Sequence, residues 1–130
     1  MKKLLFIIML TSSLAVFAGR GHYVAFVNDS DSPVVTSVTN SVCMYEINKL
    51  NMVLQPHQTT ASIYIEDKKS DWCFFKSPQF LLEVKNSVTN ETAYFHYAHF
   101  IWDLSTNSDF AYIASLTQGD QDDVKIRIVR

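Results

Sequence analysis

The sequence predicts an all-β fold, a small antiparallel β-sandwich, and three observations support this prediction. Short segments of alternating or continuous apolar residues recur along the chain, separated by clusters of Asn, Asp, Ser and Thr. No stretch alternates strands with helices in the way that α/β folds require. Glycine is scarce, with 3 residues in 130, which argues against the glycine-rich loops that bind phosphate groups. About seven or eight short strands suit either an immunoglobulin-like or a jelly-roll-like sandwich.

Residues 1–18 are predicted to be a secretory signal peptide. A basic Met-Lys-Lys start precedes an apolar run over residues 4–10, and small side chains stand at positions 16 and 18. The apolar run is shorter than the ~20 residues that cross a bilayer. We therefore expect cleavage before Gly19 and one β-sandwich domain over residues 19–130. The mature protein is expected to be secreted or periplasmic.

The expected strands follow one another along the chain, and each ends at polar turn residues or at proline. The last strand has the clearest period of two, with Val124, Ile126 and Ile128 predicted to face inward. The strands before it are predicted at 23–28, 34–39, 42–47, 52–54, 62–66, 72–75 and 79–85.

Residues 92–104 fit two structures. Their aromatic content is typical of strands, whereas Tyr94, Tyr97 and Ala98 recur at helical spacing. We favour a strand, a turn and a second strand over one short helix. On a helix, three possible zinc or iron ligands would share a face, namely His96, His99 and Asp103. On a strand, His96 and His99 point to opposite faces, so we expect no metal site and no cofactor.

Cys43 and Cys73 are the two cysteines of the chain. In an exported protein this number predicts one disulfide bond. The bridge would close a loop of about thirty residues and stabilise the fold by about 3–4 kcal/mol in the chain-entropy model. A redox Cys-x-x-Cys motif is excluded because the two cysteines are far apart in the sequence.

The charge of the mature chain restricts its partners. Removal of the signal peptide leaves nine basic residues against thirteen acidic ones, a net charge of −4, with no basic stripe. Nucleic acid is therefore not an expected partner, because its binding depends on neutralised phosphates. A permanently anionic membrane target is disfavoured for the same reason. No stable membrane insertion is expected after signal cleavage.

Patterns for catalysis and for calcium binding are weak. No serine lies in a Gly-x-Ser-x-Gly motif, and no other motif points to catalytic residues, so the protein is not expected to be an enzyme. The clustered carboxylates of segment 119–123 could hold a calcium ion, but their spacing does not match an EF-hand loop. We expect this segment to be a solvated hairpin turn.

The aromatic residues provide the main functional indication. Trp72, Trp102, Tyr94 and Tyr97 could form a binding surface, since aromatic side chains are enriched in binding hot spots. The alternative is that they fill the core of the sandwich. The sequence leaves both interpretations open.

By elimination, the sequence favours a non-catalytic binding module that recognises a protein partner or a glycan. One alternative is an envelope inhibitor or immunity-type protein that neutralises an enzyme or toxin by inserting its acidic loop into a basic cleft. Another is a membrane-active secreted protein. Residues 26–34 (FVNDSDSPV) and 53–65 (VLQPHQTTASIYI) resemble the opening of small secreted β-sandwich groups such as aegerolysin-like proteins. That resemblance implies the fold only, and no functional residue is carried over from it.

Overall fold

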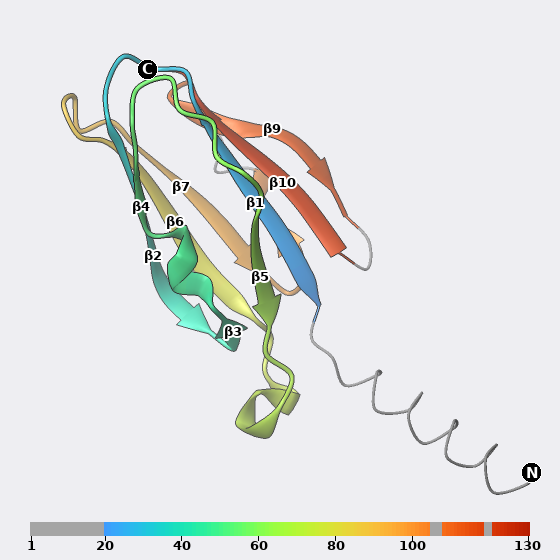
Figure 1. Ribbon diagram of the computed structural model, residues 1–130. Helices are drawn as coiled ribbons and strands as arrows, with labels where there is room; N and C mark the ends of the chain where they lie inside the picture. The colour runs from blue at the N-terminus through green and yellow to red at the C-terminus, as the bar shows by residue number, and fades with distance from the viewer. Residues whose placement is uncertain (1–19, 105–107, 119–120) are drawn as a thin grey trace, which may run out of the picture.

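Two five-stranded β-sheets pack face to face in the computed structural model, which describes residues 20–104, 108–118 and 121–130 (Figure 1). The strand order is β3-β5-β1-β10-β9 in sheet A and β4-β2-β6-β7-β8 in sheet B. The predicted signal peptide, 1–18, lies outside the described residues. The elements are β1 (Gly21–Asn28), β2 (Val34–Val42), β3 (Met44–Tyr45), the 3-10 turn η2 (Ile47–Leu50), β4 (Met52–Leu54), β5 (Ile63–Asp67), the 3-10 turn η3 (Asp71–Phe75), β6 (Gln79–Asn86), β7 (Thr92–Ala98), β8 (Ile101–Trp102), β9 (Ala111–Thr117) and β10 (Gln121–Ile128).

The core lies between the two sheets and follows the alternation of side chains along each strand. In β10 the predicted inward residues are all buried, namely Val124, Ile126 and Ile128. They meet the inward side chains of β6 and β7, which include Leu82 and Phe95. Burying one such side chain stabilises the fold by about 1.5–3 kcal/mol relative to leaving it exposed. The predicted sandwich and the predicted inward face of the last strand are therefore confirmed.

One strand pair departs from the predicted antiparallel arrangement. Strands β1 and β10 run parallel, with His22 opposite Asp122 and Phe26 opposite Ile126. Parallel neighbours need a long connection, and here it comprises every strand between the first and the last. Local turn patterns predict hairpins, so they contain no information about this pair. The pairing places residues separated by 100 positions side by side.

Two predicted strands are wrong. Residues 42–47 are divided among the end of β2, the two-residue strand β3 and the start of η2, because Cys43 and Glu46 have φ angles of 55° and 56°, outside the range of extended backbone. Residues 72–75 form turn η3, in which the backbone N–H groups of Cys73 and Lys76 donate to carbonyls three residues earlier. Aromatic residues favour strands where they pack on a half-buried sheet. Figure 1 shows η3, the turn after β5, projecting beyond both sheets instead.

Residues 92–104 confirm the favoured arrangement of strand, turn and strand. Strands β7 and β8 are joined by His99 and Phe100, whose φ angles of 53° and 66° reverse the chain. The short helix considered for this segment is wrong, because Ala93, Phe95 and Tyr97 alternate into the core. The sequence pattern also misses β9, whose burial does not alternate cleanly.

Candidate functional site

The most exposed apolar feature is a short aromatic loop at one end of the sandwich. We define the aromatic loop as residues 70–76, which contain turn η3. The exposed fractions of Trp72, Phe74 and Phe75 are 60%, 55% and 92%. Phe74 and Phe75 contact each other edge to face, with ring centroids 4.9 Å apart. Three large adjacent apolar side chains in water indicate an interaction surface.

The aromatic loop is held to the sandwich by a covalent bond and by polar contacts. The predicted disulfide is present: Cys73, buried in the middle of the loop, is bridged to Cys43 between β2 and β3. The backbone N–H of Lys68, just before the loop, donates to the Cys43 carbonyl at 2.7 Å. The hydroxyls of Tyr45 and Ser70 lie 3.0 Å apart. These contacts attach the loop to the sandwich at Cys73 and at Ser70.

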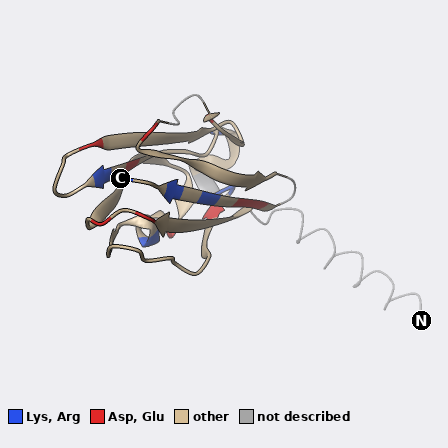
Figure 2. Ribbon diagram, turned by 90° about the horizontal axis from the view of Figure 1, so that it is seen from above, with Lys and Arg blue, Asp and Glu red and all other residues tan. Residues whose placement is uncertain are grey.

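Lysine side chains surround the aromatic rings at this end. The ammonium of Lys76 lies 4.6 Å from the ring centroid of Trp72, and that of Lys69 lies 4.2 Å from the centroid of Phe100. The ammonium of Lys68 lies 5.6 Å from the centroid of Tyr45. Residues 68–76 contain three Lys and one Asp, a net charge of +2 in a chain whose overall charge is negative. Elsewhere acidic and basic positions are interspersed (Figure 2).

The four aromatic residues predicted to bind a partner do not form one surface. Trp72 is exposed on the aromatic loop, whereas Tyr94 is exposed on the outer face of β7. Trp102 and Tyr97 are buried in the core, with their ring centroids 5.6 Å apart. For these two residues the core interpretation is correct. Phe74 and Phe75 were not among the predicted site residues, although their position next to a disulfide cysteine and a lysine is visible in the sequence.

A buried network of charged groups crosses the core of the sandwich. The His22 ring lies between two carboxylates, with Nε2 2.7 Å from Asp67 Oδ1 and Nδ1 2.8 Å from Asp122 Oδ2. The Arg20 guanidinium pairs with the second oxygen of Asp122. The hydroxyl of Tyr97 donates to Asp67 Oδ2 at 3.2 Å. The side chains of His22, Asp67 and Asp122 have no exposed surface.

The surroundings of this network define its role. Each nitrogen of the His22 ring has a carboxylate partner, and the Arg20 guanidinium pairs with Asp122, so the buried polar groups of these side chains are satisfied within the protein. The residue types resemble an acid–base site, but the three fully buried side chains are closed to a substrate. The network is therefore structural.

The prediction that residues 119–123 form a solvated turn is wrong for Asp122, whose side chain is buried, while residues 119 and 120 lie outside the described residues.

Tyr97, which donates to Asp67 in this network, makes the stability of the protein depend on pH. Burial, followed by the charge of Asp67, raises the pKa of Tyr97 above its ordinary value of 10. In the unfolded chain the phenol ionises near pH 10, so above about pH 10 the folded state binds more protons than the unfolded state. The free energy of unfolding therefore falls as the pH rises through this range.

We expect Tyr97→Phe to remove this contribution to alkaline destabilisation. Between about pH 10 and 11, its free energy of unfolding should fall less steeply than that of the natural protein, by up to ~1.4 kcal/mol per pH unit. Urea denaturation at each pH measures the two slopes. Tyr94→Phe, at an exposed tyrosine on the same strand, is the control and should keep the natural slope. Equal slopes for Tyr97→Phe and the natural protein would contradict the prediction.

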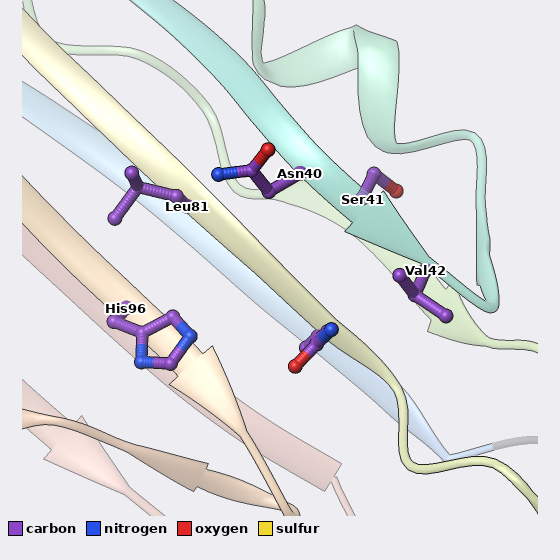
Figure 3. Close-up of a pocket in the computed structure, with 6 residues that line it drawn as sticks. Asn40, Ser41, Val42, Leu81 and His96 are labelled. Atoms are coloured by element: carbon purple, nitrogen blue, oxygen red, sulfur yellow. The ribbon is translucent and has the colours of Figure 1, made fainter.

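The outer face of sheet B has a groove of about 630 Å³, lined by residues from three neighbouring strands (Figure 3). Strands β2, β6 and β7 contribute Asn40, Leu81 and His96, respectively. The other lining residues are Ser41, Val42 and Gln79. Four of the six residues are polar, and none of the six is Lys, Arg, Asp or Glu.

His96, His99 and Asp103, the possible metal ligands if residues 92–104 formed a helix, do not form a site. His96 lies on the outer face of β7, whereas His99 lies in the following turn, with its Nδ1 3.1 Å from Ser77 Oγ. Among residues 20–104, 108–118 and 121–130, no three His, Cys, Asp or Glu side chains are arranged to hold a metal ion.

Comparisons with known proteins supply no family or relative from which a function could be transferred. No protein-family model matches the chain, and no curated protein matches it. The resemblance of residues 26–34 and 53–65 to aegerolysin-like proteins is therefore not supported by a family match. Function must be inferred from the geometry of the described residues, with the aromatic loop as the candidate site.

Proposed function

We propose that this protein is a secreted or periplasmic, non-catalytic binding module that recognises a protein partner through its aromatic loop. The observation that carries the proposal is Phe75, a large apolar side chain that is 92% exposed on a turn braced by a disulfide. An aromatic side chain held in this way is suited to enter a pocket on a partner. The Cys43–Cys73 bridge fits an oxidising compartment outside the cytoplasm. No helix within the described residues is long and apolar enough to span a bilayer.

The shape and charge of the aromatic loop indicate what kind of partner fits. The loop is convex and apolar at its tip, so the matching surface is a concave apolar pocket. The lysines at positions 68, 69 and 76 favour acidic groups around the rim of that pocket, which would also accelerate association. A glycan is the weaker occupant here, because Lys76 lies over the Trp72 ring that a sugar would use for stacking.

An inhibitor or immunity-type protein is one form that such a module can take. The aromatic loop suits insertion into an enzyme cleft because it projects from the sandwich and is braced. Insertion of the acidic segment 119–123 into a basic cleft is not supported, because the Asp122 side chain faces the core. The proposal therefore rests on Phe75 and its neighbours in either case.

Site-specific photo-crosslinking tests the proposal. A photoreactive phenylalanine analogue replaces Phe75 in the full chain, and in a control it replaces Val88, which is 69% exposed and lies on the turn between β6 and β7. We expect one dominant protein adduct from position 75 in material from the producing cells, and none from position 88. With the purified partner, Phe75→Ser should weaken binding by about 10- to 100-fold, and Val88→Ser should not.

Two outcomes would overturn the proposal. Equal labelling from positions 75 and 88 would show that the aromatic loop is not a contact surface. Adducts with lipid alone from position 75 would show that the loop contacts a membrane surface and not a protein, which would favour the membrane-active alternative. Because Phe75 is exposed, Phe75→Ser should leave the free energy of unfolding within about 0.5 kcal/mol of the natural value. A binding defect is therefore separable from misfolding.

A further inference from the structure

The groove on sheet B carries a second inference, which is independent of the aromatic loop. Its lining offers hydrogen-bond donors and acceptors together, since the amides of Asn40 and Gln79 supply both, and so does the hydroxyl of Ser41. His96 adds a ring nitrogen of either kind. In the part of the chain that the structure describes, no hydrogen bond or ion pair uses these four side chains. They are available to a ligand.

The backbone of β2 gives the groove its shape. Pairing between β2 and β6 shifts register between Thr39 and Val42, which leaves two residues out of the ladder. The first of them, Asn40, has a left-handed φ of 53°. Bulges of this kind redirect side chains and are frequent beside binding sites. Figure 3 shows the Asn40 amide directed over the sheet towards Leu81 and β6.

Strand pairing places apolar and aromatic surface beside these polar groups. Leu81 is the pairing partner of His96 in β7, so the two side chains lie next to each other on the outer face. Tyr94 precedes His96 by two residues on the same face, is 46% exposed and pairs with Glu83, so it lies beside the six lining residues and is not one of them. Residues two apart on a strand lie about 7 Å from each other, which is close to the width of one sugar ring. An exposed aromatic ring offers a flat apolar surface for the C–H groups of a sugar.

The charge of the lining selects among polar ligands. None of the six lining residues is Lys, Arg, Asp or Glu. Phosphates, sulfates and carboxylates are normally bound by Arg, Lys or clustered N–H groups, so the groove does not suit anionic ligands. A neutral ligand rich in hydroxyl groups matches the lining, because each hydroxyl both donates and accepts.

We propose that this groove binds a neutral saccharide of one or two rings, with Tyr94 as the stacking surface and Asn40, Gln79 and His96 as hydrogen-bonding residues. The groove volume of about 630 Å³ is in the range of small-molecule sites. Val42, at one edge of the groove, directly precedes the disulfide cysteine Cys43 that anchors the aromatic loop. The groove and the proposed protein-binding loop therefore each adjoin one cysteine of the same disulfide bond.

Titration followed by NMR tests this proposal with the full mature chain. The probes are neutral mono- and disaccharides, compared with glucuronate and a sugar phosphate. We expect the neutral sugars to shift the side-chain amide signals of Asn40 and Gln79 and the ring signals of His96 and Tyr94. Gln79→Ala should weaken binding about 3- to 10-fold. Gln121→Ala is the matched control, because Gln121 is an exposed strand glutamine in the other sheet.

Each remaining outcome would overturn the proposal. If no neutral sugar shifts the groove signals at the limit of its solubility, the groove is not a saccharide site. If the anionic sugars bind more tightly, the argument from the uncharged lining fails. Equal weakening by Gln79→Ala and Gln121→Ala would place binding elsewhere. Photo-crosslinking at position 75 is a separate experiment. Failure of the protein-binding proposal can therefore be distinguished from failure of the saccharide proposal.

Discussion

His22→Asn is expected to lower the free energy of unfolding by about 3–5 kcal/mol, the cost of breaking a buried ion pair by removing one partner. The substitution leaves Asp67 and Asp122, both fully buried, without the imidazole ring that lies between them. An asparagine amide donates from a single nitrogen, whereas the His22 ring contacts the two carboxylates through two separate nitrogens. This loss is a large part of the ~5–15 kcal/mol stability of a typical domain. Urea denaturation at neutral pH measures the difference.

His57→Asn is the matched control for this experiment. His57 also contacts a carboxylate, with Nε2 2.7 Å from Asp31 Oδ1, but both side chains are largely exposed to water. Its φ angle of 62° is one that asparagine tolerates, so the substitution introduces little strain. Exposed pairs of this kind contribute about 0–1 kcal/mol. If the two variants lost similar amounts of stability, the network around His22 would not make the large contribution to the free energy of unfolding that its burial implies.

Removing the disulfide should have the second largest effect. Cys43 and Cys73 are separated by 30 positions, and in the chain-entropy model a bridge over such a loop contributes about 3–4 kcal/mol. Cys43→Ala/Cys73→Ala should therefore unfold at a clearly lower urea concentration. Amide hydrogen exchange in residues 70–76 should rise as well, because the bridge is the covalent anchor of the aromatic loop. Affinity for a protein partner should fall with the order of the loop.

Dithiothreitol provides the control for the bridge. Reduction of the natural protein should lower its stability to that of the double variant, and the double variant should not respond to the reductant. An unchanged urea midpoint after complete reduction would contradict the expected stabilisation.

Local sequence patterns determined most of the fold. Alternation in segments such as 79–85 and 124–128 predicts which side chains enter the core, because the period of a strand is two residues. The two cysteines predicted their own bridge, since no other pairing exists within the chain. Residues 42–47 and 72–75 were predicted incorrectly because their apolar and aromatic residues are strand-like in composition. Positive φ angles at Cys43 and Glu46 interrupt the first segment, and the second forms a 3-10 turn whose Cys73 is bridged to Cys43.

The candidate sites depend on pairings that no local pattern contains. His22, Asp67 and Asp122 meet because the first and last strands run parallel and β5 lies on the other side of β1. The register shift in β2 opens the groove beside β6 and β7. Composition averages charge over the whole surface, so it does not reveal the lysines that gather around the aromatic loop.

The sequence by itself therefore determined the sandwich class, the bridge and the inward faces of the regular strands, because each depends on neighbours within a few residues or on a unique pair. Only the tertiary structure decided which aromatic residues are buried and which are exposed. Trp102 and Trp72 have the same side chain, but Trp102 follows a tight turn back onto β7, whereas Trp72 lies on a turn beyond the sheets. The difference between a buried and an exposed tryptophan is set by long-range packing.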